Sequence, residues 1–337
     1  MAWPNVPFDF GIYPGGAAGG DTGLLTGLAD DPEAIVDCLD RLQGSSARLI
    51  VRAYDGFQDA GSPLEKAATA PADYAQYAIA GKRPLDLVLQ YRSVSADIAG
   101  YLAFIRDRIG LHQEYLYSVQ ITEEPNFKGG PDVIDGPYPE VLNALVEGVI
   151  AAKQILRELG AEYVKVGFNA TPTFGAAAAF WSQLKVLATP EFGEALNFVG
   201  LDFFPDVFRP AAPDGQAGDI GSSVRGILEA MRNIWLPEAN ISDSVAIHIT
   251  EHGWPTGLTR SAERQADVLE TVVRDVYALR ASLNIERYTL FSLRDVSLSD
   301  AEDNLFRYFG ITDAQYVSKP AFRRFQVLIN ELSLPVR

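Results

Sequence analysis

Short apolar runs rich in β-branched and aromatic residues recur along the chain and alternate with longer segments of helical periodicity. Several of these runs are almost continuously apolar, which is typical of parallel strands that are buried on both faces. The runs that we expect to form strands are Phe8–Tyr13, Arg48–Ala53, Leu85–Tyr91, Tyr117–Thr122, Tyr163–Phe168, Phe198–Phe204, Val245–Thr250 and Arg287–Leu293.

One-sided apolar stripes between these runs predict helices. Asp31-Pro32-Glu33 has the features of a helix start, because it combines a capping side chain, a proline for the first turn and an acid at the positive end of the helix dipole. The segment Gly56–Arg83 has only a weak stripe, so we expect it to be irregular. The other predicted helices are Ser95–Gly110, Pro139–Gly160, Gly175–Leu187, Ser222–Trp235, Ala262–Leu283 and Pro320–Leu332.

Eight predicted strands, each but the second followed by a predicted helix, predict a (β/α)8 TIM barrel. The chain has 337 residues and no break in composition, so we expect residues 1–337 to form a single (β/α)8 catalytic domain. The rival is a doubly wound open sheet, which usually has fewer strands and a glycine fingerprint after the first of them.

The composition limits the classes of partner and cofactor that we expect the protein to bind. The chain carries 44 acidic and 28 basic residues, a net charge of −16 that disfavours nucleic acid and anionic membrane surfaces. Cys38 is the single cysteine and there are three histidines, so we expect no intrachain disulfide, no metal and no cofactor. No apolar run is long enough to span a bilayer and no signal peptide is visible, which predicts a cytoplasmic protein, or a secreted one if a leader has been removed.

In such a barrel the site lies at the carboxyl ends of the strands. Acids, aromatic residues and a few arginines and amides follow the predicted strands. Those that we single out as substrate-binding candidates are Arg52, Tyr91, Glu123, Asn126, Asn169, Asp202, Phe204, His252, Trp254, Arg294 and Asp295.

Glu124 and Glu251 follow the fourth and seventh predicted strands, which face each other across the mouth of a closed barrel. Two carboxyl groups in this arrangement can flank one bond. Glycoside hydrolysis with retention needs such a pair, because one carboxylic acid protonates the leaving oxygen while the other carboxylate attacks the anomeric carbon. For retention we expect the two carboxyl groups to lie roughly 5 to 5.5 Å apart.

The motifs around this pair resemble those of clan A glycoside hydrolases. The segment 121–126, Ile-Thr-Glu-Glu-Pro-Asn, resembles their strand-four Asn-Glu-Pro motif, and 249–257, Ile-Thr-Glu-His-Gly-Trp-Pro-Thr-Gly, resembles the strand-seven motif of the family 17 β-1,3-glucanases. Val51-Arg52, the segment Leu201–Pro205 and the segments 309–311 and 319–322 also look like clan A segments. The resemblance implies a carbohydrate substrate, with Glu124 as the acid/base and Glu251 as the nucleophile.

The chain departs from that pattern at three places. Glu123 stands where the family has the asparagine that binds the sugar 2-hydroxyl, so we expect a different contact at that carbon. Phe203 and Phe204 stand where many members have a tyrosine that hydrogen-bonds the nucleophile. The strand-eight tryptophan is absent, and Phe291 or Trp254 takes its place in our interpretation.

Strict strand alternation would place Glu251 on the face opposite to His248 and Thr250, so a bulge is needed for both polar sets to reach the interior. His248 to His252 also match the H-x-x-E-H zinc motif. That motif requires a helix, whereas on a strand the two histidines lie roughly 13 Å apart, too far to share one ion. The glycine-rich segment Gly15–Gly20 lacks a Gly-Lys-Ser/Thr ending, so we expect a mobile first loop there.

Three alternatives to a hydrolase remain open from the sequence. A barrel that binds sugars without turnover would keep the fold, and a transglycosylase would use the same two carboxyl groups with another acceptor. A metal-dependent barrel enzyme would need ligands that three histidines supply poorly.

Overall fold

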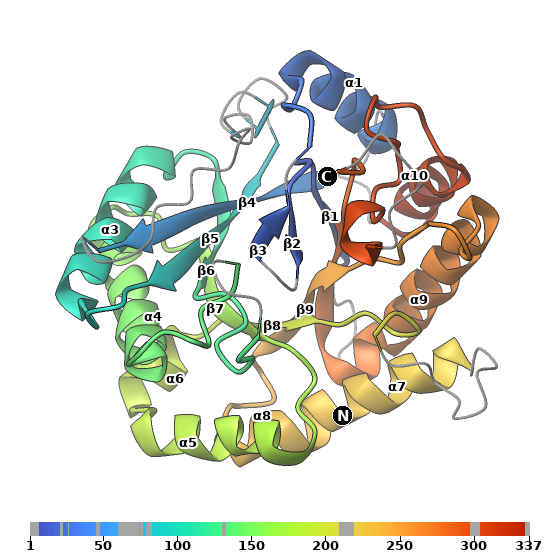
Figure 1. Cartoon of the computed structure of the whole chain (residues 1–337). Helices are drawn as coiled ribbons and strands as arrows, with labels where there is room; N and C mark the ends of the chain where they lie inside the picture. The colour runs from blue at the N-terminus through green and yellow to red at the C-terminus, as the bar shows by residue number, and fades with distance from the viewer. Residues whose placement is uncertain are drawn as a thin grey trace.

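The computed structural model describes residues 7–20, 23–25, 27–44, 48–59, 74, 77–78, 83–129, 133–208, 219–296 and 304–333. Eight parallel strands close into a barrel in the order β1-β10-β9-β8-β7-β6-β5-β4, and helices surround it (Figure 1). The strands are β1 (Asp9–Tyr13), β4 (Leu49–Gln58), β5 (Leu85–Arg92), β6 (Leu116–Ile121), β7 (Lys165–Ala170), β8 (Phe198–Asp202), β9 (Ala246–His252) and β10 (Ile285–Phe291). The prediction of a (β/α)8 barrel is confirmed.

The ring closes through β1, which pairs with β4 on one side and with β10 on the other. Phe10 lies opposite both Leu49 and Tyr288 in these two ladders. All barrel pairings are parallel, so the carboxyl ends of the strands gather at one mouth. That a single catalytic domain spans residues 1–337 stays a prediction.

The helices follow the predicted pattern. Asp31 caps α1 by accepting hydrogen bonds from the backbone of Glu33 and Ala34, and Pro32 occupies the first turn. Ser261 caps the longest helix in the same way. The described helices are α1 (Pro32–Gln43), α3 (Ile98–His112), α4 (Val141–Glu158), α5 (Ala179–Leu187), α6 (Pro190–Ala195), α7 (Ile220–Ala230), α8 (Leu236–Glu238), α9 (Ala262–Leu283) and α10 (Pro320–Leu332), with short turns at Gly175–Ala178 and Leu305–Arg307 and a π-helix at Met231–Trp235.

Two segments differ from the expectation. The second barrel strand continues to Gln58, and most of the segment 56–83 that follows lies outside the described residues. Within the glycine-rich segment, residues 18–20 form β2 (Ala18–Gly20), which pairs antiparallel with β3 (Gly23–Leu25), and the mobility of this first loop stays a prediction.

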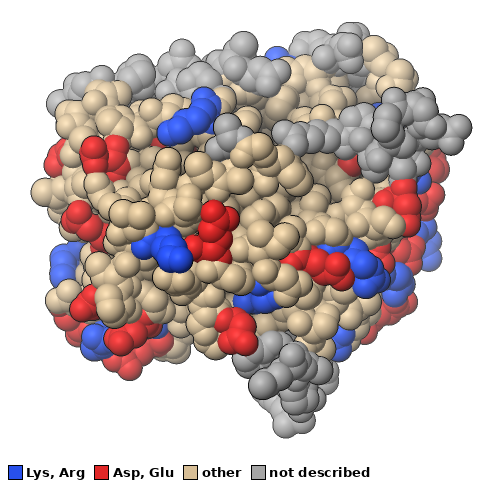
Figure 2. All heavy atoms as spheres, turned by 90° about the horizontal axis from the view of Figure 1, so that it is seen from below, with Lys and Arg blue, Asp and Glu red and all other residues tan. Residues whose placement is uncertain are grey.

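Acidic and basic side chains are interspersed on the side of the molecule that Figure 2 shows. The acidic side chains therefore do not form one continuous patch on that side. None of the helices in the described ranges combines the length and the apolar character that crossing a bilayer requires.

Candidate active site

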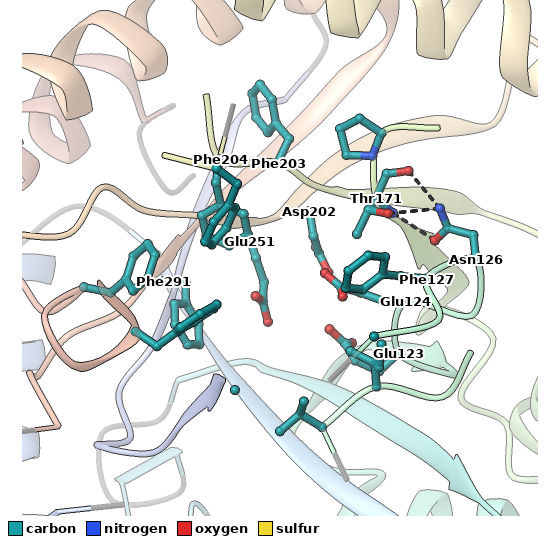
Figure 3. Close-up of a pocket in the computed structure, with 18 of the residues that line it drawn as sticks. Glu123, Glu124, Asn126, Phe127, Thr171, Asp202, Phe203, Phe204, Glu251 and Phe291 are labelled. Atoms are coloured by element: carbon teal, nitrogen blue, oxygen red, sulfur yellow. Dashed lines mark hydrogen bonds between the residues drawn. The ribbon is translucent and has the colours of Figure 1, made fainter. Parts of the chain in front are cut away.

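A cavity of about 1130 Å³ opens at the carboxyl ends of the barrel strands. Its floor carries Glu123, Glu124, Asp202 and Glu251, whose strands β6, β8 and β9 come from one half of the barrel. Figure 3 shows the carboxyl groups of Glu123, Asp202 and Glu251 directed toward a common space. The volume lies slightly above the usual range for small-molecule sites, roughly 300–1,000 Å³, so the cavity has room for more than one sugar ring.

A bulge in β9 brings Glu251 to this cavity. Along β8 the partner of Leu201 is Ile249, but the partner of Asp202 is Glu251, so one extra residue, Thr250, is inserted. The ladder with β10 shifts register at the same place. A bulge of this kind re-aims the side chains that follow it, and it allows Thr250 and Glu251 both to reach the interior. The bulge that strand alternation required is therefore present.

The turn after β6 aims the two neighbouring glutamates. Thr122 and Glu124 have φ angles of +63° and +43°, a left-handed conformation that costs energy in residues with a Cβ and is often found at functional sites. Two buried side chains hold this turn. Asp135 accepts a hydrogen bond of 2.7 Å from the backbone N–H of Glu123, and Asn169 accepts one of 2.8 Å from the backbone N–H of Glu124.

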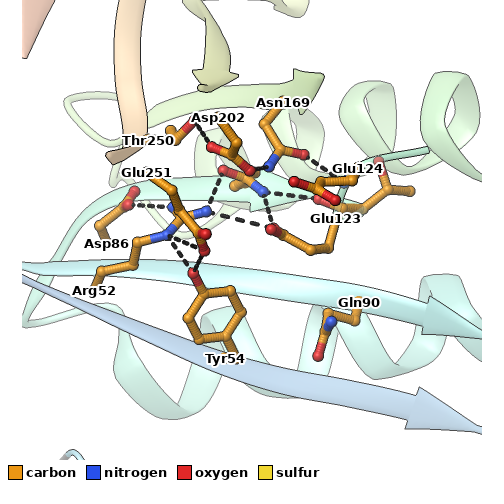
Figure 4. A network of polar contacts seen from close by, with 12 residues as sticks. Arg52, Tyr54, Asp86, Gln90, Glu123, Glu124, Asn169, Asp202, Thr250 and Glu251 are labelled. Atoms are coloured by element: carbon orange, nitrogen blue, oxygen red, sulfur yellow. Dashed lines mark hydrogen bonds and ion pairs between the residues drawn. The ribbon is translucent and has the colours of Figure 1, made fainter. Parts of the chain in front are cut away.

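Arg52 lies beneath the carboxylates and is fully buried. Its guanidinium is held by Asp86 at 2.8 Å and by the side-chain oxygen of Gln120 at 3.0 Å. The same group lies 3.4 Å from a carboxylate oxygen of Glu123 and 3.9 Å from one of Glu251 (Figure 4). A fixed cation at this place stabilises the ionised form of the carboxylates around it.

Tyr54 is a site residue that the sequence reasoning missed. Its hydroxyl accepts a hydrogen bond of 2.7 Å from Nε of Arg52 and donates one to the carboxylate of Glu251 (Figure 4). Tyr54 therefore provides the contact to the predicted nucleophile that Phe203 and Phe204 cannot make. The signal was present in the sequence, since residues two apart on a strand share a face and Arg52 was already singled out.

Three carboxyl groups crowd around this arginine. Oxygens of Glu123, Asp202 and Glu251 all lie within 4.8 Å of one another. Thr250 donates a hydrogen bond of 2.5 Å to Asp202. Burial, followed by the neighbouring Glu123 carboxylate, raises the pKa of Asp202. The guanidinium of Arg52 supplies a positive charge that Glu123 and Glu251 share.

The two predicted catalytic groups have different surroundings. Removal from bulk water, then the charges of Asp202 and Glu251, raise the pKa of Glu124 well above its usual range. Burial and the charge of Asp202 raise the pKa of Glu251 to about 8, but Arg52 and the Tyr54 hydrogen bond oppose that rise. Burial therefore favours a proton on both groups, and Arg52 opposes it at both, whereas the hydrogen bond from Tyr54 favours the ionised form of Glu251 alone. Surroundings that separate two carboxyl groups in this way are typical of an acid and a nucleophile.

The sequence-predicted residues divide into three sets. Among the described residues, those that line the cavity are Glu123, Glu124, Asn126, Asp202, Phe204 and Glu251. Arg52 and Asn169 lie just beneath and contact members of that set. Those that the structure does not bring to the cavity lining are Tyr91, His252, Trp254, Arg294 and Asp295.

Packing accounts for the aromatic residues of the third set. The ring of Tyr91 lies against Tyr101 at 5.1 Å, on the helix side of β5. Its neighbours along the strand, Gln90 and Arg92, line the cavity in its place. The indole of Trp254 packs under the guanidinium of an arginine of the following loop and is buried.

The other members are held in polar contacts of their own. Arg294 pairs with Asp30 at 2.7 Å, and Asp295 pairs with Lys319 at 2.6 Å. Arg294 and Asp295 are both buried. They stabilise the loops near the last strand, and they do not face the carboxylates.

The histidines of the H-x-x-E-H match both lie in β9. His248 stacks on Phe198 with a ring separation of 4.2 Å, and the ring of His252 shares a hydrogen bond with Tyr288. Burial lowers the pKa of each to about 3. Both histidines lie on one β-strand and not on a helix, so the helical geometry of that zinc motif is excluded.

No protein-family model and no curated sequence matches the chain. Solved structures do resemble it. A family 39 glycoside hydrolase from Bacteroides cellulosilyticus WH2 superposes with a TM-score of 0.63 at 13% identity, over 97% of this chain and 64% of the other. The chain thus spans less than two thirds of the length of that enzyme.

Two other structures also match over nearly the whole of this chain. A β-glucosidase from Exiguobacterium marinum superposes with a TM-score of 0.59 at 13% identity, over 98% of this chain and 99% of the other. A glucosidase from Croceicoccus marinus superposes with a TM-score of 0.60 at 14% identity, over 97% and 70% of the two chains. At these identities the likeness shows the fold, which is a barrel shared with these enzymes.

Proposed function

We propose that the protein is a retaining glycoside hydrolase. The observation that carries this proposal is the pair of carboxyl groups, Glu124 after β6 and Glu251 in β9, that face one cavity in contrasting surroundings. The barrels that resemble this one in fold include enzymes described as glucosidases and as a family 39 glycoside hydrolase, which supports the same class of reaction.

In the first step Glu251 attacks the anomeric carbon of the substrate and forms a glycosyl ester. Glu124 donates its proton to the glycosidic oxygen as the bond breaks, so the leaving group departs as an alcohol. Arg52 and Tyr54 act on Glu251, since both favour its charged form before the attack. The Tyr54 hydroxyl also fixes the orientation of the attacking carboxylate.

In the second step Glu124, now a carboxylate, takes a proton from a water molecule that attacks the glycosyl ester. The sugar is released with its original configuration, because two inversions occur in sequence. An alcohol in place of that water would give transglycosylation at the same site.

Glu123 and Asp202 serve the substrate in this proposal. Their oxygens lie within 4.8 Å of an oxygen of Glu251, so they border the carbon that Glu251 attacks. The sugar hydroxyls next to that carbon can donate hydrogen bonds to them. Such contacts orient the ring for attack.

The test is a screen of aryl β-glycosides that releases a coloured phenol, followed by NMR of the first-formed sugar anomer. Release that depends on Glu124 and Glu251, with a β-sugar as the first product, supports the proposal. A protein that binds sugars but releases no phenol from any substrate would be a silent carbohydrate-binding barrel, and an α-product would contradict retention.

A further inference from the structure

The cavity has an apolar side that the carboxylates do not explain. The exposed phenylalanines of the described part of the chain all line this cavity, namely Phe127, Phe174 and Phe208, with exposed fractions of 50%, 49% and 50%. Single exposed apolar side chains are common, but a group of rings around one opening marks a binding surface.

These three rings come from neighbouring strand ends. Phe127 follows β6, Phe174 follows β7 and Phe208 follows β8, and these strands are adjacent in the barrel. Phe127 belongs to the same turn as Glu124, since its backbone N–H donates to the carbonyl of that residue at 3.0 Å. The apolar side is therefore the side from which the proposed acid approaches the substrate.

Further aromatic residues connect the apolar side of the cavity to the floor that carries the carboxyl groups. Phe208 stacks on Phe306 at 5.4 Å and meets Phe204 edge to face at 5.7 Å. Phe204 in turn meets Phe309 at 5.5 Å, and Phe309 meets Phe291 at 5.7 Å. This aromatic wall, residues 127, 174, 204, 208, 291, 306 and 309, presents ring faces and edges to the cavity.

The polar groups on that side largely satisfy one another. Asn126 donates to the carbonyl and the hydroxyl of Thr171 at 3.0 Å each, and the backbone N–H of Thr171 donates back to Asn126 at 3.0 Å (Figure 3). Asp206 accepts a hydrogen bond from Trp254. The opposite side, near β4 and β5, carries Tyr54, Gln90 and Arg92, which also bond within the protein: Gln90 donates to the carbonyl of Val133 at 2.8 Å and accepts from Arg92 at 2.5 Å.

We infer that the leaving group of the substrate is apolar, an alkyl or aryl aglycone rather than a second sugar. This inference rests on the proposed function, because Glu124 protonates the leaving oxygen and the aglycone must extend past that residue toward Phe127, Phe174 and Phe208. A hydroxyl-rich sugar placed there would lose water contacts and find few free partners, whereas an alkyl chain gains from burial against the rings.

The experiment measures binding of methyl, butyl, hexyl and octyl 1-thio-β-glycosides of glucose, galactose and xylose by calorimetry. The sulfur linkage resists hydrolysis, so binding is read independently of catalysis. For at least one sugar, affinity should rise by about two- to fourfold per methylene up to hexyl. The corresponding disaccharides should bind no better than the methyl glycoside.

Substitutions then test whether the dependence of affinity on chain length arises at the aromatic wall. Phe127→Ser, Phe174→Ser and Phe208→Ser should each flatten the dependence on chain length and leave the affinity for the methyl glycoside within about twofold. Val186→Ser is the matched control, because Val186 is 83% exposed and does not line the cavity. It should leave the whole series unchanged.

The two proposals fail separately. Affinity that does not depend on chain length in any series, or tighter binding of disaccharides than of octyl glycosides, would overturn the apolar aglycone even if aryl glycosides are hydrolysed. Tail-dependent binding without hydrolysis of any aryl glycoside would instead keep the apolar subsite and remove the hydrolase. A flattened series in Val186→Ser would also overturn the assignment to this wall.

Discussion

The hydroxyl of Tyr54 donates a hydrogen bond to the carboxylate of Glu251, although the two residues lie on strands β4 and β9. The same hydroxyl accepts a hydrogen bond from Nε of Arg52. Arginine, tyrosine and glutamate thus form a chain in which each donor acts on the next acceptor, and a hydrogen bond to a charged group is stronger than one between neutral groups.

Tyr54→Phe should lower kcat about 10- to 100-fold, because a hydrogen bond to a charged group contributes roughly 1.5–3 kcal/mol. It should also raise the pKa of the acidic limb of the rate profile, since the Tyr54 hydrogen bond lowers the pKa of Glu251. The measurement is kcat/KM against pH on an aryl glycoside. Tyr117→Phe is the control, because Tyr117 bonds Asp9 at the start of β1 and should leave both quantities unchanged. An unaltered profile in Tyr54→Phe would remove Tyr54 from the mechanism.

The rate profile of the unmodified protein should peak at neutral to alkaline pH. Glu251 must be ionised to attack, and burial holds its pKa at about 8. Glu124 must keep its proton, and its pKa is also raised. We therefore expect kcat/KM to increase between pH 5 and pH 8. A maximum near pH 4 to 5, where ordinary carboxyl groups titrate, would mean that neither shift operates during catalysis.

The two adjacent glutamates should behave differently. Glu124→Ala should still release dinitrophenol from a dinitrophenyl glycoside, because that leaving group needs little protonation. It should then accumulate the glycosyl-enzyme, and azide should restore turnover and give a β-glycosyl azide. Glu123→Gln should keep part of its turnover and raise KM or change the preferred sugar. If Glu123→Gln loses all activity while Glu124→Gln does not, the acid is Glu123.

Stability should depend on the same burial. A carboxyl group with a raised pKa in the folded state stabilises the fold fully below its unfolded pKa, near 4.5, and loses that contribution as pH rises through about 8. Glu251→Gln removes the charge. The difference in free energy of unfolding between this variant and the unmodified protein should therefore shift in favour of the variant by about 1 kcal/mol or more from pH 5 to pH 8.5, given roughly 1.4 kcal/mol per pKa unit. Glu147→Gln, on the exposed face of α4, should show no such gain. If Glu251→Gln and Glu147→Gln change the free energy of unfolding equally at pH 5 and at pH 8.5, Glu251 does not carry a buried charge that destabilises the fold.

The hydrophobic pattern predicted the barrel because each strand is a compact apolar run, and it predicted the places where Glu124 and Glu251 leave their strands. It could not place Glu251 by alternation, since the bulge at Thr250 arises from pairing with β8 and β10. Tyr91 was selected for its chemistry, but alternation along β5 turns it toward Tyr101.

The features that could not be predicted from the sequence depend on contacts between segments that are far apart in the chain. The aromatic wall joins residues from several separate loops, and its formation depends on the closure of the barrel. Arg294 and Asp295 were plausible strand-end residues, yet each finds its own partner in Asp30 and Lys319. Such pairings between segments far apart in the chain leave no local pattern in the sequence.

The central claim is that Glu251 forms a covalent bond to the sugar. A dinitrophenyl 2-deoxy-2-fluoro-β-glycoside of the preferred sugar should trap this species, because fluorine slows both steps while the good leaving group preserves the first. After digestion, mass spectrometry should find one fluoroglycosyl unit on the peptide that contains Glu251, and none in Glu251→Gln. A label on Glu123 or Glu124, or full turnover to an α-product without any label, would contradict the account.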